Sequence, residues 1–131
     1  MIRITIPDEI ENHAVFVEED GYEEEPGIYL GKYYAGGPEY SMHLSCANIQ
    51  QLLPNIRELA EHPYIYVAGV PHLRDKDRHE IKSRMEWRNT LILTKTGVFS
   101  MVIHHNVAAI LLPTLDYFLL HKRLLIPGRE K

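Results

Sequence analysis

The densest group of potential metal ligands lies between residues 72 and 80. Imidazole and carboxylate groups are frequent transition-metal ligands, and a metal-assisted hydrolase needs about three of them around one open position. However, the segment contains no His-Glu-x-x-His pair, and its cations Arg74, Lys76 and Arg78 oppose a bound divalent ion. The segment is therefore either the metal site of a hydrolase or a solvated loop of alternating charge. The candidate ligands are His72, Asp75, Asp77 and His79.

Basic residues continue beyond this group. Residues 79–88 alternate between charged side chains and apolar or small ones, which is the period of a β-strand with one charged face. Such a row could hold the phosphates of a nucleotide-like anion, with an aromatic ring stacking nearby. Because acids are interleaved and the pI is near 6.0, we do not expect general nucleic-acid binding. The candidate anion-binding residues are Arg74, Arg78, Arg84, Arg88 and Trp87.

The acidic charge of the chain is concentrated near its beginning. The first 25 residues hold nine acids and one base, although the whole chain has a net charge of only −4. We expect residues 18–26 to form an acidic turn, because six like charges cannot pack together. This turn is a solvated loop, a partner for the chain's own basic row across a homodimer, or a docking surface for a basic protein. The candidate contact residues are Glu18, Glu19, Asp20, Tyr22, Glu23, Glu24, Glu25, Tyr33 and Tyr34.

Cys46 is the only cysteine, so an intrachain disulfide and a cysteine-based zinc cluster are excluded. A thiol in the first turn of a helix is activated by the helix dipole, but a lone cysteine more often packs as a small apolar residue. The first seven residues lack the pattern of a signal peptide. We therefore expect a cytoplasmic protein, and we expect no cofactor.

The elements that position these residues can be read from periodicity and turn signals. In the first half we expect strands at 3–6, 13–18, 27–34 and 39–44, with the Gly-rich turn at 35–38. Ser45 is placed to cap a helix over 46–62, and Pro54 must kink or divide that helix.

The second half follows the same order. We expect strands at 64–70, 79–88, 90–95 and 98–104. His104 and His105 precede a helix start, where a cap or a buried hydrogen bond is expected. Asn106 is placed to cap a final helix that runs to about residue 124 and is kinked near Pro113.

These elements define one α+β domain over residues 1–131, an antiparallel sheet of order ββββ-α-ββββ-α with two Pro-kinked helices packed on one face. The composition of 45% hydrophobic and 24% charged residues fits a globular chain and excludes disordered and low-complexity classes. The longest apolar stretch, 107–120, is shorter than the roughly 20 residues of a membrane span.

The final helix is apolar around nearly its whole circumference, whereas a surface helix needs only one apolar face. We therefore expect a second chain to cover it, most simply in a homodimer. Together with the local charged surfaces, this favours recognition over catalysis. We interpret the chain as a small cytosolic binding or regulatory module of the inhibitor, adaptor or regulator type. The alternatives are the binder of a small nucleotide-like anion and the metal-assisted hydrolase.

Overall fold

The structure is a computed structural model of the 131-residue chain, and it describes residues 2–8, 12–22, 24–61, 72–74, 80–86 and 90–125. Within these residues the chain forms eight strands and two helices, which confirms the predicted α+β class. In chain order the elements are β1 (Arg3–Pro7), β2 (His13–Glu19), β3 (Gly27–Tyr34), β4 (Glu39–Ser45), α1 (Cys46–Glu61), β5 (His72–Arg74), β6 (Glu80–Glu86), β7 (Thr90–Lys95), β8 (Phe99–His104) and α2 (His105–His121).

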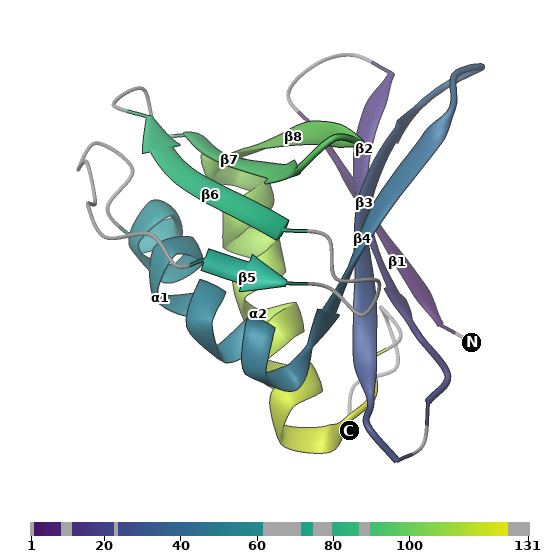
Figure 1. Ribbon diagram of the computed structural model, residues 1–131, viewed down its shortest axis with the longest axis vertical. Helices are drawn as coiled ribbons and strands as arrows, with labels where there is room; N and C mark the ends of the chain where they lie inside the picture. Colours follow the sequence, from purple (N-terminus) through teal and green to yellow (C-terminus); the bar gives the residue numbers. More distant parts are fainter. Residues whose placement is uncertain are drawn as a thin grey trace.

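The strands are divided between two antiparallel sheets, not the single sheet expected from the sequence. One sheet has the order β1-β2-β3-β4 and the other has the order β5-β6-β7-β8. In Figure 1 the first sheet stands upright on the right, and the second sheet lies across the upper half of the helices, with β5 nearest their middle. Alternating polarity identifies strands but not the sheet that each one joins. The chain leaves the first sheet through α1, and each sheet is then assembled from hairpins between neighbouring strands.

Each sheet turns one face toward the helices, because apolar residues alternate with polar ones along its strands. In the first sheet this inner face includes Ile6, Val17, Leu30 and Leu44, all 1% exposed or less. In the second sheet the buried positions are Ile81, Ser83, Leu91, Leu93, Met101 and Ile103. Lys82 is exposed on β6, as the alternation predicted, and pairs in register with Thr94.

Described side chains of the two sheets are also in direct contact. The ring of Tyr40 on β4 stacks on the ring of Phe99 on β8, with 5.4 Å between centroids. The ammonium group of Lys32 lies 5.9 Å from the centre of the same Phe99 ring. These aromatic and cation–π contacts join two sheets that share no hydrogen-bonded strand pair.

Helix α1 begins with a reciprocal cap, as Ser45 predicted. The backbone N–H of Asn48 donates to Ser45 Oγ, and the backbone N–H of Ser45 donates to Asn48 Oδ1, each at 3.1 Å. This is a capping box in which Asn replaces the usual Glu or Gln. The helix then runs through Pro54 as one element, so the proline does not divide it.

Helix α2 also continues through a proline, Pro113, but it begins earlier than predicted. His104, not Asn106, occupies the N-cap position and makes no side-chain cap hydrogen bond. The predicted cap is wrong because His105 already has helical geometry, which places Asn106 inside the first turn. The helix ends at Lys122, whose left-handed backbone (φ 59°) lets its N–H donate to the carbonyl of Phe118.

The apolar surface of α2 is covered mainly by the chain itself. The helix packs along α1 and also contacts β1 and β8, which buries Val107, Leu111, Leu115 and Phe118. Ile110 and Leu120 stay 48% and 77% exposed. No helix among the described residues is both long enough and apolar enough to cross a membrane.

Candidate functional site

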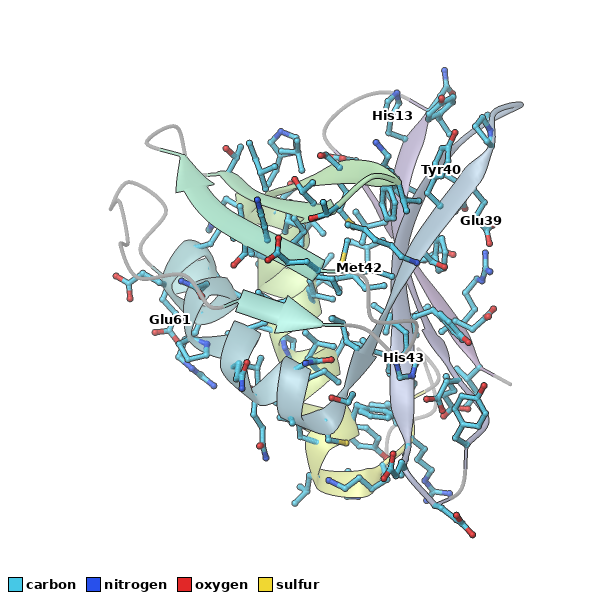
Figure 2. The ribbon with its side chains drawn as sticks, viewed as in Figure 1. His13, Glu39, Tyr40, Met42, His43 and Glu61 are labelled. Atoms are coloured by element: carbon cyan, nitrogen blue, oxygen red, sulfur yellow. The ribbon has the colours of Figure 1, made fainter. Side chains whose placement is uncertain are left out.

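The outer face of the first sheet, opposite the helices, carries the polar residues of its four strands. The pairing places Arg3, Glu18, Tyr29 and His43 at successive positions across β1, β2, β3 and β4. Figure 2 shows His43 on the half of β4 that leads into α1, while Glu39 and Tyr40 lie toward its other end. The face therefore has two ends, one near His43 and one near Glu39.

The end near Glu39 is closed by side chains of the sheet itself. The guanidinium of Arg3 lies 4.0 Å from the centre of the Phe16 ring and donates to Glu18 at 2.9 Å and to both oxygens of Glu39 at 2.8 Å. The hydrogen bonds from Arg3 lower the pKa of Glu39, and the bonds to Glu39 raise the pKa of Arg3. Phe16 is consequently 1% exposed although it lies on the outer face.

Gly31 is required beneath the Phe16 ring. A Cβ atom at Gly31 would lie 2.4 Å from Phe16 Cζ and 2.2 Å from the backbone oxygen of Tyr40. The ring can therefore lie flat on the sheet only because β3 has no side chain at this position.

The acidic segment is less free than the sequence suggested. Glu18 and Glu19 belong to β2 and not to the turn. Glu18 pairs with Arg3, and Glu19 accepts hydrogen bonds from the backbone N–H of Ile2 (3.2 Å) and of Leu124 (2.8 Å). These two carboxylates thus act within the chain: one closes the sheet face, and the other joins the two terminal segments.

Asp20 and His43 form a buried hydrogen-bonded pair. His43 Nε2 lies 2.7 Å from Asp20 Oδ2, and the two side chains are 9% and 2% exposed. Burial raises the pKa of Asp20, but the hydrogen bonds from His43 and from the backbone N–H groups of Tyr22 and Gly27 outweigh burial and hold this pKa below its usual value. The carboxylate is therefore the acceptor, and Nε2 carries the hydrogen.

Glycine at position 27 makes room for this pair. A Cβ atom there would lie 2.8 Å from both His43 Nε2 and Asp20 Oδ2. Tyr22 and Tyr29 complete the surroundings, with ring centroids 6.4 and 5.3 Å from that of His43 and interplanar angles of 71°. The imidazole is thus held by one hydrogen bond and two aromatic rings.

A cavity of about 340 Å³ opens beside this imidazole. It is lined by Tyr22, Glu24, Glu25 and His43. Glu24 and Glu25 are exposed, and Tyr22 is 52% exposed. A second cavity of about 380 Å³ lies on the other side of the acidic segment, where Glu19, Asp20 and Tyr22 face Phe118, Lys122 and Arg123 at the end of α2.

The remaining predicted contact residues lie elsewhere or outside the described residues. Glu23 is outside them. Tyr33 and Tyr34 lie at the far end of β3, where Tyr33 packs against Phe16 (6.2 Å between centroids) and Tyr34 stacks on His13 (5.0 Å). The structure therefore does not bring these tyrosines to the acidic turn.

Most of the predicted anion and metal sites lies outside the described residues. This holds for Asp75, Asp77, Arg78, His79, Trp87 and Arg88 and for the predicted strand at 64–70. The backbone places His72 and Arg74 on β5, opposite Lys82 and Glu80, and Arg84 on β6, opposite Ile92. Elsewhere in the described chain, no group of three or more His, Cys, Asp or Glu side chains could hold a metal ion.

Three other titratable residues have structural contacts. The thiol of Cys46 lies 3.3 Å from the carbonyl oxygen of Pro26, to which it donates. His105 Nδ1 lies 3.0 Å from the carbonyl oxygen of Leu59, and His104 Nδ1 lies 2.9 Å from Asp8 Oδ1. The expected hydrogen bonds of both histidines at this strand end are confirmed.

The structure pairs two residues, Asp20 and His43, whose contact was not predicted from the sequence. Asp20 was predicted as a contact residue, but its pairing with His43 was not, since 23 positions separate the two residues. Comparison of the chain with models of known protein families and with curated proteins finds no match.

Proposed function

We propose that this protein is a small, cytosolic, non-enzymatic binding module that acts through protein–protein contacts at the cavity beside His43. The observation that carries the proposal is the lining of that cavity, in which the exposed carboxylates of Glu24 and Glu25 adjoin the half-exposed ring of Tyr22. Tyrosine is enriched at protein interfaces because its ring supplies a large contact area and its hydroxyl a hydrogen bond.

The acidic residues of this region fall into two groups, those bonded within the chain and those that are exposed, and this supports the proposal. Glu18, Glu19 and Asp20 satisfy groups of the chain itself and hold the turn in place. Glu24 and Glu25 lie beyond these anchors and are exposed. Because these anchors fix the chain before the two exposed carboxylates, less conformational entropy is lost when a basic partner binds them.

A charge-reversal experiment tests the proposal. The variant Glu24→Lys/Glu25→Lys should lose the proteins that the wild type captures from an extract of its source cells, identified by mass spectrometry. The matched control is Glu58→Lys/Glu61→Lys on α1, which changes the net charge equally; Figure 2 shows Glu61 far from His43. Capture that survives in the first variant, or that is lost equally in both, contradicts the proposal.

We also propose that the module forms a homodimer through α2. Less apolar surface is open to a second copy than the sequence indicated, because α1 and both sheets already cover most of this helix. What is left for a second copy is the exposed surface at Ile110 and Leu120. Light scattering should give a dimer for the wild type and a monomer for Ile110→Glu/Leu120→Glu, and a monomeric wild type at micromolar concentration contradicts the homodimer.

A further inference from the structure

The cavity beside His43 is lined by two carboxylates, an imidazole and a tyrosine, so most of its polar groups accept hydrogen bonds. Glu24 and Glu25 contribute carboxylates, which only accept when they are ionised. No cation is among the residues that line this cavity in the described part of the chain. The lining is therefore complementary to a group that donates hydrogen bonds and carries positive charge.

The side chain of His43 indicates independently that the cavity suits a hydrogen-bond donor. Its side chain is more than nine-tenths buried, lines the cavity and is held at Nε2 by the ionised Asp20. With the hydrogen on Nε2, the neutral imidazole has its lone pair on Nδ1. Among the described residues, Nδ1 has no hydrogen-bond partner. Among the described residues, Asn106 Oδ1 and not His43 Nδ1 is the buried side-chain atom without a partner, so Nδ1 is reached by solvent and is open to a donor from outside the chain.

The aromatic ring at the cavity narrows the class of cation. Tyr22 is 52% exposed and its ring lies 6.4 Å from that of His43, at 71° to it. Guanidinium is planar, carries five N–H donors and stacks on aromatic faces, whereas ammonium is a point charge with three donors. Two carboxylates, one imidazole nitrogen and one ring match the guanidinium better.

We infer that the cavity lined by Tyr22, Glu24, Glu25 and His43 binds an arginine side chain of a protein partner, an inference that rests on the proposed function. The volume of about 340 Å³ lies at the lower end of the range of small-ligand pockets and suits a single side chain. Glu24 and Glu25 pair with the cation, Tyr22 stacks on it, and His43 Nδ1 accepts one of its N–H groups.

The test is an NMR titration of the full chain with three capped amino acids. Nα-acetylarginine methylamide should shift the signals of Tyr22, Glu24, Glu25 and His43 and saturate in the millimolar range, about what one buried side chain supplies. The lysine analogue should bind several-fold more weakly, because it cannot span the acceptors. The citrulline analogue, which has nearly the same shape but no charge, should not saturate. Equal shifts with citrulline, or shifts outside these four residues, overturn the inference.

Glu24 and Glu25 are exposed, so substitutions there test binding without disturbing the fold. Glu24→Gln/Glu25→Gln should weaken the arginine probe about tenfold, and the matched pair Glu58→Gln/Glu61→Gln on α1 should leave it unchanged. An equal effect of both pairs overturns the inference. If the arginine probe fails while charge reversal still abolishes partner capture, the inference is overturned and the proposed function stands. If charge reversal leaves capture intact, the proposed function fails and the inference fails with it.

Discussion

The described chain contains two histidine–aspartate pairs, His43–Asp20 and His104–Asp8, whose hydrogen bonds are 2.7 and 2.9 Å long. In the first pair the side chains are 9% and 2% exposed, and in the second they are 20% and 9% exposed. His43 uses Nε2 and lines a cavity between tyrosines, whereas His104 uses Nδ1 and caps a helix. The same two residue types therefore hold an imidazole beside a cavity in one place and join a helix start to the segment after β1 in the other.

The difference between the pairs lies in their surroundings. Asp20 also receives backbone hydrogen bonds within its own turn, so its pairing fixes the turn as well as the imidazole. His104 and Asp8 are 96 positions apart and join the beginning of α2 to the segment after β1. Proximity of a carboxylate to an imidazole is thus not enough to indicate a site; an open cavity beside the ring is the second requirement.

Removal of Asp20 should change the free energy of unfolding more than any other substitution proposed here, and comparison with removal of Asp8 should distinguish the two pairs most clearly. Asp20→Ala leaves a buried imidazole and two backbone N–H groups unpaired, and we expect it to lower the free energy of unfolding by roughly 3 kcal/mol. Asp8→Ala should cost about 1 kcal/mol, because its partner is more exposed. Urea unfolding followed by circular dichroism measures both, with an unchanged m-value as the control for two-state behaviour. Equal losses would remove the distinction between the pairs.

Acid should remove the contribution of Asp20. Because the folded-state pKa of Asp20 lies below its unfolded value near 3.8, its stabilisation is present above that value and is lost as the pH falls through the folded pKa. The stability difference between wild type and Asp20→Asn should therefore shrink as the pH falls below about 4, by about 1.4 kcal/mol for each unit of pKa shift. A difference that grows on acidification would contradict the direction of the shift.

Substitution of the histidines separates binding from folding. His43→Gln should weaken the arginine probe several-fold, because the acceptor at Nδ1 is lost, while His104→Gln should leave it unchanged. Both dissociation constants come from NMR titration of the folded protein. Loss of binding in the His104 variant would show that the effect passes through the fold as a whole.

Glu19→Gln should lower the free energy of unfolding by as little as Asp8→Ala does, and it extends the comparison to a third carboxylate. One of its oxygens becomes an amide group that faces a backbone N–H, so we expect a loss of about 1 kcal/mol. Hydrogen exchange should become faster at Ile2 or Leu124, the two amides that donate to Glu19. Unchanged exchange at both would show that Glu19 does not hold the terminal segments.

Local patterns predicted the local structure well. The alternation of residues 13–18 and 27–34 predicted β2 and β3, and Ser45 predicted the start of α1, because periodicity and capping depend on neighbouring residues. The division into two sheets could not be predicted in this way, since it depends on where α1 carries the chain. The start of α2 was also missed, because His104 caps it without a side-chain hydrogen bond.

The candidate site was predicted only in part, because its contacts join residues that are distant in the sequence. The excess of acids marked residues 18–26, but the sequence did not show that Glu18 and Glu19 face groups of their own chain. One signal was available for His43. It stands between Met42 and Leu44, whose alternation places it on the outer face, in register with Tyr29. Its pairing with Asp20 required the fold of the turn.

The bond from the N–H of Leu124 to Glu19 spans 105 positions. During synthesis the strands of the first sheet leave the ribosome long before Leu124 does, and contacts between residues so distant in sequence form late. Until then Glu19 lies at the end of β2 without this donor, beside the turn that carries Asp20 and Tyr22. The first sheet should therefore form during synthesis before Leu124 can donate to Glu19, so this bond is added to a sheet that already exists.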